Sequence, residues 1–493
     1  MQKIVVLIFL IAMQFYGYTI AAEKSLDLDL SDMDLGLKTQ YPKFLLTGYL
    51  KTETAYRFRV PRTFTKIRNI IQIESNYEVD QWSSIHFSGW AYHDLVYDLF
   101  DYRTITGRYL RDEDQPLSFV EGLPQGKDSD VAQIRELFIN LRNDWADLRM
   151  GKQWIIWGII PGIRVVDELN PLDFRELILP DLLDYRIPLW SAKLDTYWGD
   201  SNNLQFVWIP DLRFNKPAPP GSEWELFQII PGTTFPDAGQ FKNSEIGIRY
   251  KRKIMGAEIT LSYFNTWDDF PVLFRHAKIV QVDTGGGQGA GIVSPEFYPS
   301  YHRMQMYGGT FQKTIWGQIF NAEGVFVTGK YFGLKAVDNN HDGFLDHDGV
   351  LQKNHARLGL GVDFNVFKTE VSPSLTEWYI FDYDPSILQD RFDTTLNVFI
   401  RKTFSKRSSV FELLGIYLVN LQEIYLKPQF SFRPASQFEI TVGMNLFYGN
   451  KSHLGLLAVN GQPTNLVEVA QSSHFIGNFS NNDRIFVNFK YSF

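Results

Sequence analysis

Hydrophobic and polar residues alternate along much of this chain with the two-residue period of a β-strand that has one apolar face and one wet face. The last ten residues show the pattern clearly, and Phe486 is their single exception. The apolar face of this terminal strand consists of Ile485, Val487, Phe489, Tyr491 and Phe493. Its polar face consists of Arg484, Asn488, Lys490 and Ser492. Such a strand fits either a soluble all-β fold or the wall of a lipid-facing barrel.

The same alternation recurs throughout the chain and predicts about 18 strands of roughly ten residues, the length that a tilted strand needs to cross a bilayer. A count of 16 would also fit if one or two segments are misassigned. The predicted strands lie near residues 46–58, 66–78, 84–93, 134–142, 146–153, 189–198, 203–209, 244–251, 256–266, 302–313, 317–330, 354–366, 370–381, 390–402, 409–419, 423–433, 437–448 and 484–493.

The connections between these strands alternate between short and long. The short ones are residues 79–81, 143–144, 199–202, 253–256, 367–368 and 433–436. The long ones lie near 95–132, 156–188, 211–242, 267–300, 331–352 and 449–483. Short periplasmic turns that alternate with long outer loops are typical of outer-membrane barrels, and an even strand number closes the sheet without an exposed edge. We therefore predict an antiparallel up-and-down transmembrane barrel over residues 44–493.

The N-terminus predicts export. Lys3 precedes an apolar run from Ile4 to Met13 and a small-residue region, which is the pattern of a secretory signal peptide over residues 1–22. Residues 23–43 are polar and acidic and are predicted to form a periplasmic lead-in. The chain has no cysteine, which excludes disulfides and thiolate metal sites. The net charge of -8 argues against nucleic acid as a partner.

Charged faces of the predicted strands must line an interior, because an Arg at mid-depth in lipid costs about 2–4 kcal/mol. The lumen is therefore expected to be hydrated and to carry charges of both signs. The predicted pore-lining residues are Arg57, Arg68, Glu74, Arg142, Arg149, Arg249, Arg357, Asp363, Arg391 and Arg401.

Two resemblances support this interpretation. A terminal strand that ends on an aromatic residue, here Phe493, resembles the closing strand of bacterial outer-membrane barrels, which implies recognition by the barrel-assembly machinery. The segment 151–158 reads Gly-Lys-Gln-x-x-x-Trp-Gly, and 167–173 reads Asp-x-x-Asn-Pro-x-Asp. These motifs resemble a largely uncharacterised family of porin-like outer-membrane proteins of Gram-negative bacteria. The resemblance spans residues 151–176 and implies a pore more firmly than any substrate.

The predicted outer loop 156–188 mixes apolar residues with charges, a composition that does not suit a free loop. Folded back into the barrel, it would bury its apolar side on the wall and present its charges to the lumen as a selectivity constriction. An extracellular cap packed on neighbouring loops is the alternative. The predicted constriction residues are Arg164, Asp167, Glu168, Asp173, Arg175 and Glu176.

The loop 338–349 has oxygen-bearing side chains around Gly343 at calcium-loop spacing, but the closing Glu of an EF-hand is replaced by Gly349. A weak structural calcium site and a solvated acidic hairpin tip both remain open. The candidate ligands are Asp338, Asn340, Asp342, Asp346 and Asp348. No cofactor is required by this interpretation.

Together these patterns predict a porin or channel in the bacterial outer membrane that passes small solutes passively, with lipid and solute as its partners. The solute and the oligomeric state, monomer or trimer, are left open. One alternative is a barrel that serves as a sleeve or anchor for a periplasmic or electron-transfer partner. Another is an outer-membrane hydrolase with a Ser–His pair, for example at His86. The prediction is that the protein is not an enzyme.

Overall fold

The computed structural model describes residues 41–107, 130–160, 162, 164–181, 183–218, 222–224, 233–282, 290–334, 348–404, 409–450, 458–459, 462–463 and 475–493. Two compact units are distinguished, Met1–Tyr41 and Pro42–Phe493, and every described helix and strand lies in the second. No described helix is long and apolar enough to cross a membrane.

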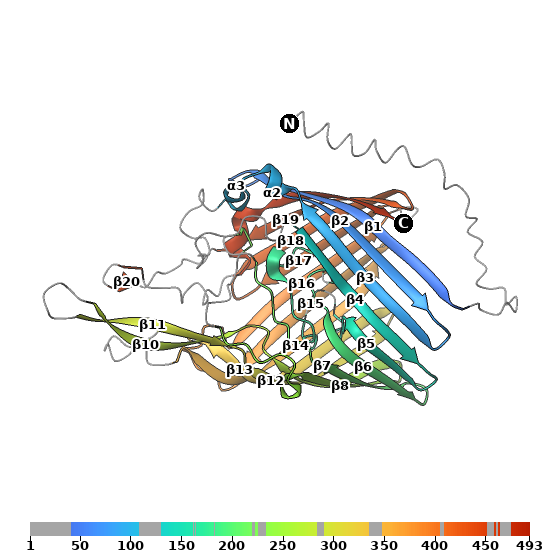
Figure 1. Ribbon diagram of the computed structural model, residues 1–493, viewed down its shortest axis with the longest axis horizontal. Helices are drawn as coiled ribbons and strands as arrows, with labels where there is room; N and C mark the ends of the chain where they lie inside the picture. The colour runs from blue at the N-terminus through green and yellow to red at the C-terminus, as the bar shows by residue number, and fades with distance from the viewer. Residues whose placement is uncertain are drawn as a thin grey trace. The chain divides into compact units, whose positions relative to one another are not determined.

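One sheet of 18 antiparallel strands forms a closed barrel, which confirms the predicted fold class (Figure 1). Each strand pairs with its neighbours along the chain, and β22 pairs with both β19 and β1 to close the ring. The strands are β1 (Lys43–Arg57), β2 (Thr63–Glu78), β3 (Ser83–Asp94), β4 (Asp130–Arg142), β5 (Ala146–Gln153), β6 (Leu189–Trp198), β7 (Asn202–Ile209), β8 (Glu245–Ile254), β9 (Ala257–Trp267), β12 (Arg303–Ile315), β13 (Gln318–Gly333), β14 (Val350–Val366), β15 (Thr369–Ile380), β16 (Phe392–Thr403), β17 (Ser409–Leu418), β18 (Glu423–Ala435), β19 (Phe438–Tyr448) and β22 (Arg484–Ser492).

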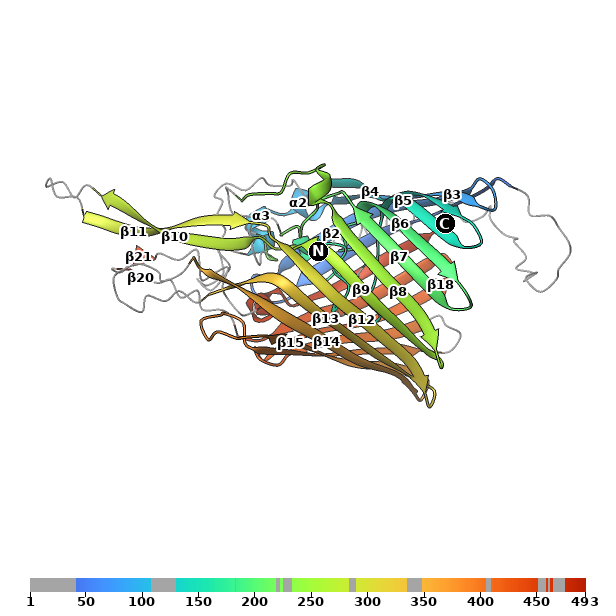
Figure 2. The same ribbon diagram turned by 90° about the horizontal axis from the view of Figure 1, so that it is seen from below.

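All 18 predicted strands are present, with ends that differ by a few residues. The predicted connection 267–300 contains a hairpin of two paired strands, β10 (Val272–Val282) and β11 (Ala290–Ser300). Figure 2 shows this hairpin extending beyond the barrel on the side of the long connections. The remaining elements are α2 (Val96–Leu99), α3 (Tyr102–Thr106), the 3₁₀ turns η2 (Phe174–Glu176), η3 (Phe241–Asn243) and η5 (Gly477–Asn482), and the short pair β20 (Ala458–Val459) and β21 (Gln462–Pro463).

All connections at one end of the barrel, here called the turn rim, are short, and the long connections lie at the other end, the loop rim. Two-residue turns at the turn rim place both central residues at positive φ, as in Met255 (49°) with Gly256 (74°) and Trp316 (52°) with Gly317 (76°). This is the type I′ geometry, whose twist matches that of paired strands. The short connections of the turn rim are residues 79–82, 143–145, 199–201, 255–256, 316–317, 367–368, 404–408 and 436–437.

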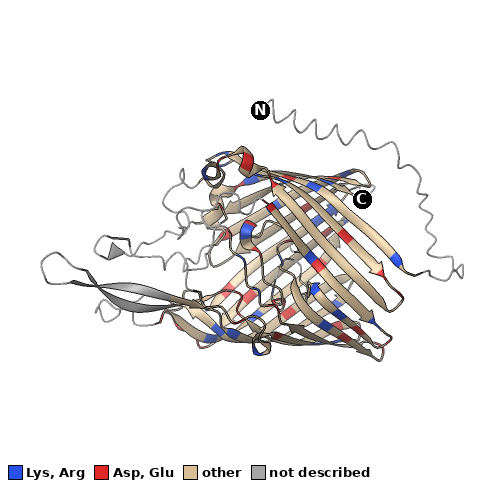
Figure 3. Cartoon of the chain, viewed as in Figure 1, with Lys and Arg blue, Asp and Glu red and all other residues tan. Residues whose placement is uncertain are grey.

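The outer surface of the barrel is apolar, and aromatic side chains gather near the turn rim. In β14, Leu358 and Leu360 on the outer face are each 46% exposed, whereas their neighbour Arg357 on the inner face is 3% exposed. This contrast is the in–out alternation that the sequence predicts. Charged residues of both signs occur along the strands (Figure 3). Exposed aromatic side chains near the turn rim include Trp82, Trp145, Trp198, Trp316, Phe367 and Phe493.

Candidate functional site

After β5 the chain turns into the barrel instead of continuing outward, and we call residues 154–188 the crossing loop. The turn is held by side chains that accept hydrogen bonds from the backbone. Asn170 Oδ1 accepts from Ile155 N at 2.9 Å, and Asp167 Oδ1 accepts from Trp157 N at 3.0 Å. These two acceptors belong to the Asp-x-x-Asn segment, so the motif residues shape the loop from within.

The apolar side of the crossing loop packs on the inner wall of β6, β7, β9, β12 and β13. Trp157 is 3% exposed and donates its indole N–H to Gln205 Oε1 at 2.7 Å. Each buried side chain of this kind contributes roughly 1.5–3 kcal/mol. The buried cluster consists of Ile155, Trp157, Ile160, Val165, Val166 and Leu169 from the loop, with Leu189, Val207, Ile209, Phe264, Met304, Met306, Val325 and Val327 from the wall.

Two carboxylates, those of Glu323 and Glu168, attach this part of the crossing loop to the barrel wall. The carboxylate of Glu323 on β13 accepts hydrogen bonds from the backbone N–H groups of Ile159, Ile160 and Val166, the last two at 2.8 and 3.3 Å. Glu168 forms an ion pair with Arg357 on β14. Burial works against the ionised form of Glu168, but the Arg357 guanidinium prevails and lowers the pKa of Glu168 to about 2.

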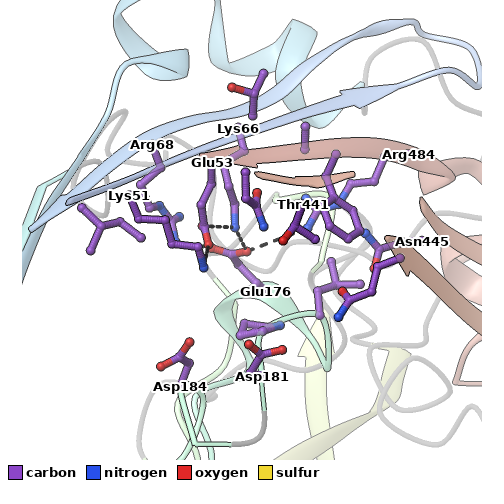
Figure 4. A pocket seen from close by; sticks show the side chains of 18 of the residues that line it. Lys51, Glu53, Lys66, Arg68, Glu176, Asp181, Asp184, Thr441, Asn445 and Arg484 are labelled. Carbon is purple, nitrogen blue, oxygen red and sulfur yellow. Dashed lines mark hydrogen bonds and ion pairs between the residues drawn. The ribbon is translucent and has the colours of Figure 1, made fainter. Parts of the chain in front are cut away.

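The other end of the crossing loop is attached to β2 and β22. The carboxylate of Glu176, in η2, contacts Lys66 Nζ and Arg68 Nη1, and Arg484 Nη2 lies 4.0 Å away. Figure 4 shows Glu176 among these cations. Burial raises the pKa of Glu176, but Arg68 and Lys66 outweigh it and lower the pKa to about 2.

These attachments lie on opposite sides of the lumen. In the ring order of the sheet, β13 with Glu323 and β2 with Lys66 are nine strands apart out of 18. Further contacts hold the loop on the β2 side. Lys427 Nζ of β18 donates to Leu179 O at 3.0 Å, and Arg135 Nη2 of β4 donates to Leu183 O at 2.7 Å. The crossing loop therefore spans the interior from wall to wall.

Two cavities flank the crossing loop. The first, of about 340 Å³, lies between the loop and strands that include β1, β2, β18, β19 and β22, and nine basic and nine acidic side chains line it. The second, of about 640 Å³, lies between the loop, β4 and residues 212–217 and 235–238 of the connection from β7 to β8. Asp173, Arg175 and Asp184 line both cavities. These three residues therefore lie between the two cavities.

The structure places the six predicted constriction residues in different surroundings. Asp173, Arg175 and Glu176 line the first cavity. Glu168 lies against Arg357 on the wall. Arg164 and Asp167 turn into the loop itself, since Arg164 donates to Asp167 O at 2.6 Å and Asp167 is 1% exposed in an ion pair with Arg186.

Two of the predicted pore-lining residues lie elsewhere than expected. Arg57 continues the face of Lys51 and Ala55 on β1, but it is fully buried at the loop rim and binds backbone carbonyls, among them Ile105 O at 2.8 Å. Arg391 precedes β16, and its guanidinium lies over Tyr379, which pairs with the outward Phe392. The others occupy the inner face: Arg68, Glu74, Arg142, Arg149, Arg249, Arg357, Asp363 and Arg401.

Sequence reasoning did not single out Glu323 or Arg135, which hold the crossing loop in place. Glu323 is a charge within an otherwise apolar and small-residue stretch, and that is the signal that could have marked it. Arg135 is sandwiched between Trp90 and Trp154, with its guanidinium carbon 4.2 and 4.8 Å from the two ring centroids. No local pattern predicts this contact.

The candidate calcium ligands Asp338, Asn340, Asp342 and Asp346 lie outside the described residues, and Asp348 is at the entry to β14. Within the described part of the chain, no three His, Asp or Glu side chains are grouped as a metal site. Calcium binding stays a prediction.

The histidines bear on the hydrolase alternative. His86 Nε2 lies 3.5 Å from a Glu136 carboxylate oxygen. Ser300 Oγ and His302 Nε2 are 2.8 Å apart, which is a Ser–His contact at the loop rim. The nearby carboxylate of Asp268 is bound by Lys330 Nζ at 2.5 Å.

Comparison with known proteins adds the following. No curated protein sequence matches this chain. Similar solved structures include OccAB3 and OccAB2 of Acinetobacter baumannii, each 8% identical, with TM-scores of 0.47 and 0.49; the matches cover 92% of this chain and 99% and 98% of theirs. The outer membrane protein opdK from Pseudomonas aeruginosa is 7% identical with a TM-score of 0.46, covering 92% of this chain and 98% of that one. A family model described as "Protein of unknown function (DUF1302)" matches residues 62–350, more than half of the chain. The chain therefore belongs to the DUF1302 family.

Proposed function

We propose that this protein is an outer-membrane channel through which small solutes pass passively, with the crossing loop as its filter. The observation that carries the proposal is the attachment of a charged loop to opposite inner walls of a closed 18-stranded barrel. A loop held at both ends narrows the lumen at a defined place. Narrowing by inward loops is a common origin of selectivity in wide barrels.

The outer surface of the barrel supports a bilayer location. Its strands present apolar side chains outward, and aromatic residues such as Trp145 (62% exposed) and Trp198 (47% exposed) gather near the turn rim. Aromatic girdles at the interfaces and an apolar band between them are the features of outer-membrane barrels. The N-terminal signal-peptide pattern agrees with export to that membrane.

The charges along the path suggest how the filter acts. The first cavity is lined by equal numbers of basic and acidic groups, so neither sign of ion is rejected by net charge alone. Passage then depends on size and on the arrangement of charges at Asp173, Arg175 and Asp184. We expect a small single-channel conductance for a barrel of this strand number.

Conductance of the purified protein in a planar bilayer tests the proposal. The test variant lacks residues 159–180, and a matched control lacks residues 283–289, which connect β10 to β11 in the sequence. A steady pore that widens only in the first variant would support the channel and place the filter in the crossing loop. Silence of the wild type and of both variants would refute passive passage.

The two alternatives make different demands. A sleeve for a partner protein needs an open lumen, and the crossing loop obstructs it. A hydrolase would use the Ser300–His302 contact, so turnover of a nitrophenyl ester that is abolished by Ser300→Ala would favour it. Absence of turnover together with a conducting pore would leave the channel as the function.

A further inference from the structure

The second cavity lies beside the shortest strands of the barrel wall. β5 and β7 have 8 residues each, whereas β4 has 13. β4 pairs with β5 only through Leu137–Arg142, so residues 130–136 continue beyond the end of β5. Two successive residues of this overhang, Ile134 (40% exposed) and Arg135 (3% exposed), both line the cavity. The cavity therefore reaches both faces of the wall.

The lining of this cavity is strongly basic in a chain whose net charge is -8. Six basic side chains line it against two acidic ones, Asp173 and Asp184. Asp173 binds Arg175, with Arg175 Nη2 and Asp173 Oδ2 2.6 Å apart, and Asp211, just outside the lining, lies 3.0 Å from Arg213 Nε. The basic side chains are Arg135, Lys152, Arg175, Arg186, Arg213 and Lys216. An excess of cations in a partly enclosed space favours a negatively charged ligand.

Two side chains of the same lining carry deeply buried donor atoms that lack acceptors. Arg186 is 2% exposed and bound to Asp167, but its Nε and Nη1 have no hydrogen-bond partner in the described part of the chain. The Tyr301 hydroxyl likewise has none among the described residues, and Tyr301 is 5% exposed. Buried donors are normally paired, because an unpaired one costs free energy. A ligand oxygen could pair with these donors only if the lining shifts to open them to the cavity, because each donor atom has less than 1 Å² of accessible surface.

One side of the cavity is aromatic rather than charged. The rings of Phe214 and Tyr301 stack with centroids 3.7 Å apart, and the centroid of Phe235 lies 5.1 Å from that of Tyr301. Phe235 is nevertheless 50% exposed. An apolar body of a ligand would cover this exposed ring while its charged end meets the basic side chains.

We infer that the second cavity binds an anion with an apolar or aromatic body, an amphiphilic carboxylate or phosphate. This assignment deepens the proposed channel function, because it names the class of solute that the channel would carry. Asp173, Arg175 and Asp184 line both cavities, so a ligand bound in the second lies next to the filter.

Calorimetric titration of the full-length protein in phosphatidylcholine nanodiscs tests the inference, with 4-phenylbutyrate as the probe. Its neutral analogue 4-phenylbutanamide has nearly the same shape. We expect saturable binding of the acid, roughly tenfold or more tighter than that of the amide, since charged hydrogen bonds are the strong ones. Equal affinities, or no binding of the acid, would overturn the inference.

Variants locate the site. Arg213→Gln, at a side chain that is 58% exposed, is expected to weaken binding of the acid roughly fivefold. Phe235→Ala should weaken acid and amide alike, because both share the apolar body. Arg252→Gln removes an exposed cation from β8 near the turn rim and serves as the control. Equal loss with Arg252→Gln and Arg213→Gln would contradict the assigned site.

A second arm separates a lipid headgroup from a free solute. If anionic lipid occupies the cavity, nanodiscs with phosphatidylglycerol will compete with the probe in the wild type but not in Arg213→Gln. If free solutes are the natural ligands, affinity for the probe will not depend on the lipid; either result supports the anion site. Conductance is measured separately. A conducting pore that does not bind the probe would overturn the anion site but not the channel function. A protein that binds the probe but does not conduct would overturn the channel function but not the anion site.

Discussion

Replacing Glu176 by Gln should release one end of the crossing loop and enlarge the channel. The Glu176 carboxylate is the loop's ionic contact with Lys66 and Arg68, and Arg484 lies 4.0 Å from it. The substitution keeps the size of the side chain and removes the charge. Lys66 keeps one acidic neighbour in this variant, Glu53, whose carboxylate lies 3.2 Å from Lys66 Nζ.

The magnitude follows from the pKa of Glu176. That pKa falls from 4.5 to about 2 in the folded protein, and the side chain is only 12% exposed. A difference of about 2.5 pKa values corresponds to about 3 kcal/mol, or a change of more than a hundredfold in the ratio of attached to released loop. The contacts of Lys427 and Arg135 with the loop remain, so the release is expected to be local.

Single-channel recording in a planar bilayer at pH 7 measures the effect. Glu176→Gln is expected to raise the mean conductance and the current noise relative to the wild type. Glu439→Gln is the matched control, because Glu439 lines the same cavity and binds Arg433 on the wall without touching the loop. Equal conductance changes in the two variants would show that charge alone, and not attachment of the loop, sets the conductance.

Three further outcomes are expected. Both loop carboxylates, Glu168 and Glu176, have pKa values lowered to about 2, so their ionic attachment is complete above about pH 4.5 and is lost as the pH falls towards 2. Conductance should therefore be constant from pH 8 to 5 and should rise below pH 4.5. A constant conductance down to pH 2 would contradict this. Glu323→Ala removes the acceptor of three loop N–H groups and should speed trypsin cleavage after Arg164, followed by mass spectrometry; an unchanged rate would refute the anchoring role. Gly359→Val should loosen the loop by about 1–3 kcal/mol, because even a Cβ there would lie 2.8 Å from a loop methyl group; conductance equal to that of the wild type would count against tight packing.

Much of the barrel could be predicted from the sequence because its information is local. Strict alternation, as in Ala356 to Val366, places each side chain inside or outside without reference to any distant residue. The strand number and the short and long connections follow from the same pattern, and all 18 strands are present in the structure. Two features differ from the prediction: Arg57 is buried against the carbonyl of Ile105, 48 positions away, and β10 pairs with β11 where a plain connection was expected.

The contacts of the crossing loop were decided only by the tertiary structure. Composition predicts that residues 156–188 need an apolar surface and a polar one, but not which wall supplies them. Glu176 meets Lys66 across 110 positions of sequence, and Arg357 meets Glu168 across 189. Closure of the ring sets these pairings, because only then do β2 and β13 face each other across one lumen. The period-two pattern determines which way a side chain points, and the closed barrel determines what it meets there.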